Sequence, residues 1–307
     1  MKERSTATQS IKPGAFAAWM ALIRPKTLGV ACAPVVAATS LAYAESHQFD
    51  ATVFLLTLTL AILMQTITNM QNDIGYTDRK AEIGNRSGLP RATANGWLSM
   101  REARLGLLVA VALALFNTVP LIIYGGYAYA AIGISSIVAA YCYMGGPKPI
   151  AYTPFGEFAV LIFFGLIATL GTYYLQTHSF STSAWILGTS LGCVAASVLA
   201  VNNFRDREHD ASVNRQTLAV LLSPCTFYIL IRTLLTFPFI GAIALAIALD
   251  GWWFLLLGAT APKALKIARA LQSTPPKMLS PVMFQCVVLE LEYCLIFSAA
   301  SLLSCIL

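Results

Sequence analysis

The feature that most constrains this chain is a series of nine apolar segments, most of which approach the roughly 20 residues that cross a bilayer core. They cover about 27–44, 51–71, 103–124, 126–144, 155–176, 184–202, 224–249, 252–271 and 282–305. Pro262 interrupts the eighth, so we expect a short, broken or tilted span there. Only 11% of the residues are charged, against about 25% in soluble domains. We therefore predict an all-α polytopic membrane protein, with about nine transmembrane helices in one domain over 1–307.

The basic residues indicate how these segments are oriented. All 20 Lys and Arg lie in the N-terminal tail or in the connections after even-numbered segments, together with the adjoining segment ends. The positive-inside rule then predicts a cytoplasmic N-terminal tail (1–20) and two cytoplasmic Asp-rich loops (72–101 and 203–223). The net charge of +6 is explained by this topology, with the lipid bilayer as partner, and implies no nucleic acid.

Two of the predicted cytoplasmic loops gather acidic residues directly after an apolar segment. The candidate oxygen ligands are Asn69, Asn72, Asp73, Asp78 and Glu82 in the first cluster and Asn202, Asp206 and Asp210 in the second. In each cluster an Asn is followed four residues later by an Asp, so the two side chains share one helix face. This doubling also suggests an internal repeat, in which segments one to four are echoed by five to eight.

The ligand types in these clusters predict the chemistry of a site. Oxygen ligands suit Mg²⁺, and phosphate oxygens commonly complete its coordination shell. Arg86 and Arg91 follow the first cluster, and Arg205 and Arg215 lie in the second, where guanidinium groups can hold the remaining phosphate charge. We predict a Mg²⁺ and diphosphate site. The alternative is that mixed charge at helix ends forms only a solvated rim.

At these residues the chain resembles the UbiA superfamily of intramembrane prenyltransferases, most closely its members that act on 1,4-dihydroxy-2-naphthoate. The matching stretches are RPKTL (24–28), NDIGY (72–76), GGPKPIAYTPFGE (145–157), FFGLIATLGTYYLQT (163–177) and NNFRDREHDASVNRQTLAVLL (202–222). The resemblance implies nine transmembrane helices around a central cavity that opens laterally to lipid. It also implies that two Asp-rich motifs bind Mg²⁺ and a prenyl diphosphate.

The resemblance also implies roles for single residues. Asp73, Asp206 and Asp210 are the implied catalytic carboxylates. Lys26 and Lys148 fall where the family has cations near the diphosphate, and Tyr152 falls in a loop that helps cover the site.

The first motif departs from the family pattern Asn-Asp-Tyr-x-Asp, because its last position is Tyr76. A shifted reading pairs Asn69 with Asp73 and takes the later carboxylate from Asp78 or Glu82. We prefer this reading because it repeats the spacing of the second cluster.

The function implied by the resemblance is Mg²⁺-dependent transfer of a polyprenyl group from polyprenyl diphosphate to 1,4-dihydroxy-2-naphthoate. Carbon dioxide and diphosphate leave, and the product is a demethylmenaquinone in the bacterial cytoplasmic (inner) membrane. Phe163, Tyr173 and Tyr174 are candidates to stabilise an allylic cation. Two alternatives stay open. One is a related prenyltransferase that uses 4-hydroxybenzoate, homogentisate or haem, and the other is a transporter of an anionic metabolite.

Overall fold

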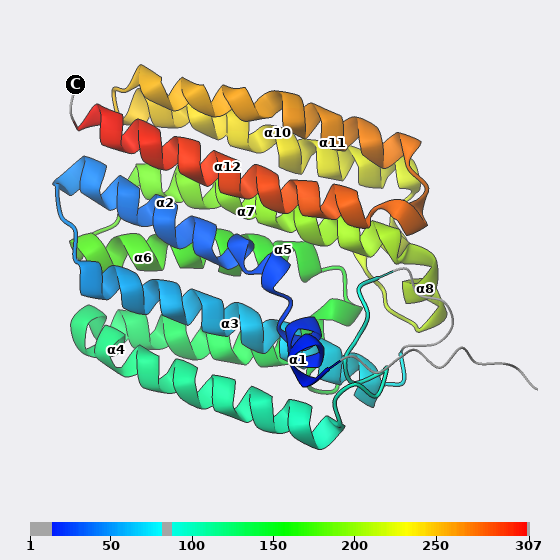
Figure 1. Cartoon of the computed structure of the whole chain (residues 1–307). Coiled ribbons are helices and arrows are strands. Elements are labelled where there is room, and N and C mark those ends of the chain that lie inside the picture. The colour runs from blue at the N-terminus through cyan, green and yellow to red at the C-terminus, as the bar shows by residue number, and fades with distance from the viewer. Residues whose placement is uncertain (1–13, 82–87, 306–307) are drawn as a thin grey trace, which may run out of the picture.

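The computed structural model describes residues 14–81 and 88–305, and these residues form helices without any strand. Six helical runs in this part of the chain are long and apolar enough to cross a membrane. They are α3 (Ala51–Asp78), α4 (Met100–Met144), the run Gly156–Thr177, α7 (Thr182–Arg205), α10 (Pro224–Ala248) and α12 (Ser280–Ser304). A bent pair, Ala15–Thr27 with α2 (Gly29–Ser46), gives a seventh. The helices lie side by side in a bundle (Figure 1), so the predicted all-α membrane architecture is confirmed.

Helix α4 is a hairpin of two arms that carries two of the predicted segments. The backbone reverses at Gly126, where φ is 69° and ψ is −161°. Only glycine adopts such a conformation readily. The first arm begins with a capping box in which Ser99 and Glu102 satisfy each other's backbone N–H groups. Predicted segments 103–124 and 126–144 therefore run as neighbouring antiparallel arms.

The eighth predicted segment is irregular, as expected. It is the 3₁₀-helix η4 (Trp252–Thr260) followed by α11 (Ala261–Ser273), with Pro262 in the first turn of α11. In α11 Lys263 forms an ion pair with Glu292 of α12. This segment is not among the helical runs of the described chain that meet the length and hydropathy criteria for a span. The total of nine transmembrane helices stays a prediction.

Helix α7 lies at the centre of the bundle, and most of its apolar length is buried. Small residues permit this close packing. A side chain on Gly165 would collide with the backbone of Gly188 and Gly192, so α7 approaches the preceding span at backbone distance. The approach occurs along the π-helix η3 (Leu161–Ile167), which lies between α5 (Gly156–Val160) and α6 (Ala168–Thr177).

Short elements occupy the end of the bundle where α3 and α7 finish. They include η1 (Pro25–Thr27), η2 (Ile150–Tyr152), α8 (Arg207–Ser212), α9 (Leu218–Leu221) and η5 (Pro276–Met278), while α1 (Ala15–Ile23) leads into the bundle. Figure 1 shows α8 at this end and the C-terminus at the other. The two Asp-rich clusters, in which Asp73 and Asp206 are 133 residues apart in sequence, are thereby brought to the same end.

Candidate active site

A cavity of about 270 Å³ lies between α2, α3, α4, the fifth predicted span and α7. Its polar lining includes residues of both sequence clusters and of the start of the chain: Arg24, Asn69, Asn72, Asn202 and Arg205. Most of the remaining wall is apolar, and it extends along the bundle to Tyr129 in the second arm of α4. The structure therefore brings asparagines of both predicted clusters to one cavity with a polar end and a long apolar body, while Asp73, Asp206 and Asp210 are not among the residues that line it.

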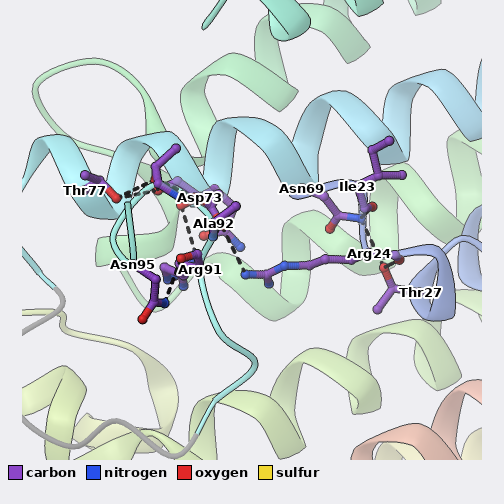
Figure 2. A network of polar contacts seen from close by, with 11 residues as sticks. Ile23, Arg24, Thr27, Asn69, Asp73, Thr77, Arg91, Ala92 and Asn95 are labelled. Atoms are coloured by element: carbon purple, nitrogen blue, oxygen red, sulfur yellow. Dashed lines mark hydrogen bonds and ion pairs between the residues drawn. The ribbon is translucent and has the colours of Figure 1, made fainter. Parts of the chain in front are cut away.

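Asp73, the first predicted catalytic carboxylate, is fully buried and held by the segment that follows the first cluster. Its Oδ2 accepts a hydrogen bond from the Ala92 N–H (3.0 Å). Its Oδ1 accepts bonds from the Thr93 N–H (3.1 Å) and Oγ1 (2.5 Å). The Arg24 guanidinium lies 4.0 Å from Oδ2 (Figure 2). Asp73 thus anchors the chain around 91–93 beside the end of α3.

The asparagines of the first cluster both line the cavity. Asn69 donates through Nδ2 to the Ile23 carbonyl (2.8 Å) and to Thr27 Oγ1 (3.1 Å), which fixes its amide (Figure 2). Asn72 lines the cavity, and its buried Oδ1 has no hydrogen-bond partner among the described residues. A buried oxygen acceptor without a donor is costly, and a cation or a bound donor group would satisfy it.

The second cluster is organised by Arg205. Its Nε and Nη2 bind the two oxygens of Asp206 at 2.9 and 2.8 Å. Nη2 also donates to Asn202 Oδ1 (2.8 Å), and Nη1 donates to Ser280 Oγ (3.1 Å). All four contacts come from one buried guanidinium. Asn202, Arg205 and Asp206 therefore form a compact unit in which a single arginine covers the predicted metal ligands.

Asp210 lies beyond this unit, in α8. Its Oδ1 is 2.7 Å from Nη1 of Arg215, and both side chains are buried. Burial lowers the pKa of Arg215 to about 9, so the guanidinium stays protonated at neutral pH. The Nε of Arg215 donates to the Ala151 carbonyl, next to Tyr152 in the loop predicted to cover the site.

Tyr152 is half-buried between two arginines, Arg79 and Arg215, each with its guanidinium carbon 5.6 Å from the ring centroid. Burial raises the pKa of Tyr152, the charge of Arg79 opposes this, and the Asp210 carboxylate adds to it. The phenol is therefore neutral at physiological pH. The location of Tyr152 over the site stays a prediction.

Other predicted residues are not among those that line the cavity. Asp78 is 44% exposed and pairs with Arg104, which is 58% exposed. Lys26 and Lys148 are also exposed, and Lys26 contacts the Phe284 ring at 5.7 Å. Arg91 is buried, and it donates from Nη1 to the Asn72 carbonyl (3.1 Å) just behind the cavity wall. Glu82 and Arg86 lie outside the described residues.

The aromatic candidates separate in the same way. Phe163 lines the cavity. Tyr173 instead donates to Glu45 Oε2 (2.6 Å) and Tyr174 stacks on Phe180 at 5.2 Å, both near the opposite end of the bundle. Of the three, only Phe163 could face a reacting carbon in this cavity.

Arg24 is the main residue at the cavity to which the sequence analysis gave no role. It ends α1 in a left-handed conformation (φ 57°, ψ 63°) and turns the chain so that its side chain reaches Asp73. An arginine directly before Pro25, at the start of an apolar span, was the available signal. The family resemblance instead implies this role for Lys26, two residues later.

The donor set fits a hard cation. Amide oxygens of Asn69, Asn72 and Asn202 and the carboxylate of Asp206 are ligand types that Mg²⁺ prefers. Within the described chain, no three His, Cys, Asp or Glu side chains are grouped closely enough to hold a metal ion by themselves. Such an ion would therefore depend on the asparagines and on oxygens of a bound diphosphate.

The chain matches known proteins over most of its length. A model of the UbiA prenyltransferase family matches residues 31–285. The 1,4-dihydroxy-2-naphthoate octaprenyltransferase of Haemophilus influenzae is 34% identical over 295 residues, which is 93% of this chain and 96% of the relative. The Escherichia coli protein of the same name is 31% identical, over 87% and 89% of the two chains.

Solved structures share the fold. A UbiA homologue from Archaeoglobus fulgidus, bound to GPP and Mg²⁺, superimposes with a TM-score of 0.68 at 14% identity, over 94% of this chain and all (100%) of that one. A digeranylgeranylglyceryl phosphate synthase gives a TM-score of 0.63 at 17% identity, over 94% and 98%.

Proposed function

The chain belongs to the UbiA prenyltransferase family, and we propose that it transfers a polyprenyl group from polyprenyl diphosphate to 1,4-dihydroxy-2-naphthoate. Carbon dioxide and diphosphate are released, and the product is a demethylmenaquinone. The observation that carries this proposal is the single cavity lined by Asn69 and Asn202, with an apolar body beyond its polar end. Relatives named for this reaction, at 31–34% identity over most of both chains, support the choice of acceptor.

The polar end of the cavity suits the diphosphate. Arg24 and Arg205 line it, and Arg91 and Arg215 lie just behind it, so positive charge surrounds the position of a departing diphosphate. Guanidinium groups bind phosphate oxygens bidentately. Charge that develops on the leaving group is stabilised most by groups fixed in advance in a site of low dielectric constant.

Mg²⁺ fits the oxygen ligands of this end, and we assign Asn69, Asn72, Asn202 and Asp206 to it. When bound, it supplies Lewis-acid neutralisation of the diphosphate. Asn202 and Asp206 would hold it, and Arg205, which binds both here, would pair with phosphate oxygens. Asp73 and Asp210 then act by holding the surrounding segments, through Thr93 and Arg215 respectively.

The apolar body of the cavity suits the prenyl chain. Phe163, Phe164, Tyr129 and Tyr143 line it. Of these, the face of Phe163 can stabilise positive charge on the allylic carbon, while the walls exclude water. The protein is an integral membrane enzyme. We propose the bacterial inner membrane as its location, with the N-terminus and both Asp-rich clusters on the cytoplasmic side, where a soluble acceptor enters.

The test is an assay on membranes that contain the protein. They are incubated with Mg²⁺, an octaprenyl diphosphate and either 1,4-dihydroxy-2-naphthoate or 4-hydroxybenzoate, and the lipid product is identified by mass spectrometry. We expect a prenylated, decarboxylated naphthoquinol, lost when EDTA is added. Membranes carrying Asp206→Ala are the control. Transfer to 4-hydroxybenzoate alone would overturn the acceptor assignment.

A further inference from the structure

Five side chains at the cavity end of the bundle alternate between arginine and tyrosine. The order is Arg91, Tyr76, Arg215, Tyr152, Arg79. The guanidinium carbons of Arg91 and Arg215 lie 3.4 and 5.0 Å from the centre of the Tyr76 ring. Those of Arg215 and Arg79 each lie 5.6 Å from the centre of the Tyr152 ring. All four distances are within the roughly 6 Å range of a cation–π contact.

The stack joins segments that are remote in sequence. Tyr76 and Arg79 end α3, Arg91 belongs to the segment before α4, Tyr152 ends η2, and Arg215 follows α8. The stack is therefore one of the contacts that set their relative positions.

Each arginine of the stack is also oriented by hydrogen bonds. Arg91 donates to the Asn72 carbonyl (3.1 Å). Arg215 binds Asp210 (2.7 Å) and the Ala151 carbonyl (3.1 Å). Solvent screens these contacts weakly, because the exposed fractions of Tyr76, Arg91 and Arg215 are only 3%, 2% and 4%. These hydrogen bonds thus fix the guanidinium groups of Arg91 and Arg215 beside the Tyr76 ring.

Tyr76 has a special place in this stack, because the two arginines that contact its ring, Arg91 and Arg215, serve different clusters. Arg91 directly precedes Ala92 and Thr93, whose N–H groups bind Asp73. Arg215 binds Asp210. One ring therefore connects the partners of a first-cluster carboxylate to the partner of a second-cluster carboxylate.

We propose that Tyr76 is a positioning residue of the transferase, and that its ring holds Arg91 and Arg215 in register so that the two clusters bind one diphosphate. The proposal rests on the proposed function. Tyr76 stands where the resembling family has a carboxylate, and a carboxylate would also attract two arginines. An aromatic face does this without adding negative charge, which leaves more net positive charge for the diphosphate.

The test compares Tyr76→Phe, which keeps the ring, with Tyr76→Leu, which removes it. The readout is the dissociation constant of the purified protein for geranyl diphosphate at saturating Mg²⁺, measured without any acceptor. We expect Tyr76→Phe to bind within twofold of the wild type and Tyr76→Leu to bind at least tenfold more weakly. Equal binding by Tyr76→Leu and the wild type would overturn the proposal.

A matched control separates positioning from general loss of a buried ring. Tyr293 is equally buried in α12, away from the cavity lining, and its hydroxyl donates to the Pro238 carbonyl. Tyr293→Leu should lower thermal stability but leave the dissociation constant within twofold. If it weakens binding as much as Tyr76→Leu does, the effect is not specific to the stack and the proposal fails.

Arg215→Lys gives a second line of evidence if Tyr76→Leu does not fold. Lysine keeps the charge near Asp210 but loses the planar group that stacks on both tyrosines. We expect binding at least fivefold weaker, and wild-type binding would contradict the proposal. Because no acceptor is present, these results are independent of whether 1,4-dihydroxy-2-naphthoate is the substrate, which the transfer assay decides.

Discussion

The two Asp-rich clusters share a local pattern but use it differently. In both, an Asn is followed four residues later by an Asp at the end of a long helix, and both asparagines line the cavity. Asp73 is held by backbone N–H groups and a hydroxyl from residues 92 and 93. Asp206 is held by the side chain of its sequence neighbour Arg205.

This difference decides what each carboxylate can do when a ligand arrives. Backbone donors cannot leave Asp73 unless the whole segment around 91–93 moves. Arg205 can leave Asp206 by rotation of its own side chain, and a diphosphate offers it equivalent oxygens. The comparison therefore assigns Asp73 to holding the site together and Asp206 to binding the ligand.

The largest effect is expected from Asp206→Asn. The change removes a charge that we assign to Mg²⁺ while keeping the shape, and loss of one such electrostatic group costs on the order of 10²–10³ in rate. Arg205 keeps its bonds to Asn202 and Ser280, so the protein should remain folded. The measurement is octaprenyl transfer per folded molecule over a series of Mg²⁺ concentrations. Unchanged transfer would remove Asp206 from the ligand site.

Asp73→Asn should reduce transfer less, by about 10- to 100-fold. It should also make the segment around 91–93 more accessible to protease. The side-chain amide of Asn accepts hydrogen bonds through its oxygen but not through its nitrogen. A buried donor at residue 92 or 93 therefore loses its acceptor. Limited trypsin digestion tests this, because Arg91 is buried in the wild type. We expect faster cleavage after Arg91 in Asp73→Asn and not in Asp206→Asn. Equal cleavage of the two variants would erase the proposed distinction.

Much of the fold could be predicted because bilayer physics leaves few solutions for long apolar segments. The hairpin of α4 is an example, since two apolar segments meet near Gly125 and Gly126 with no charge between them. The convergence of Asn69 and Asn202 also followed from spacing and from the distribution of basic residues. Both inferences use local pattern and topology alone.

The partners of the carboxylates could not be predicted in this way. Asp73 meets Thr93 because the segment before α4 folds back on α3, and nothing in the spacing of 20 residues specifies that return. The contact of Tyr76 with Arg215 depends on the packing of the end of α3 against a loop from the other half of the chain. Arg24 reaches the cavity through a left-handed turn that sequence pattern does not indicate.

A smaller effect is expected at Thr93, whose hydroxyl donates to Asp73 Oδ1. Thr93→Val keeps the backbone and volume but removes this donor, and a lost buried hydrogen bond costs about 1–3 kcal/mol. We expect a lower melting temperature and a few-fold loss of transfer. Thr93→Ser keeps the hydroxyl and serves as the matched control. If valine and serine behave alike, the hydroxyl contributes nothing to the anchoring of Asp73.

The smallest effect is expected at Asp78, the carboxylate that the sequence suggested as a later ligand of the first cluster. Its partner Arg104 and Asp78 itself are both well exposed, and such surface pairs contribute only about 0–1 kcal/mol. Asp78→Asn should therefore leave transfer within about twofold of the wild type at all Mg²⁺ concentrations. Arg104→Gln breaks the same pair from the other side and should give the same result. A loss of transfer in Asp78→Asn but not in Arg104→Gln would mean that the carboxylate acts on the ligand after all. The first cluster would then also supply a carboxylate that binds the ligand, and the proposed difference between the two clusters would disappear.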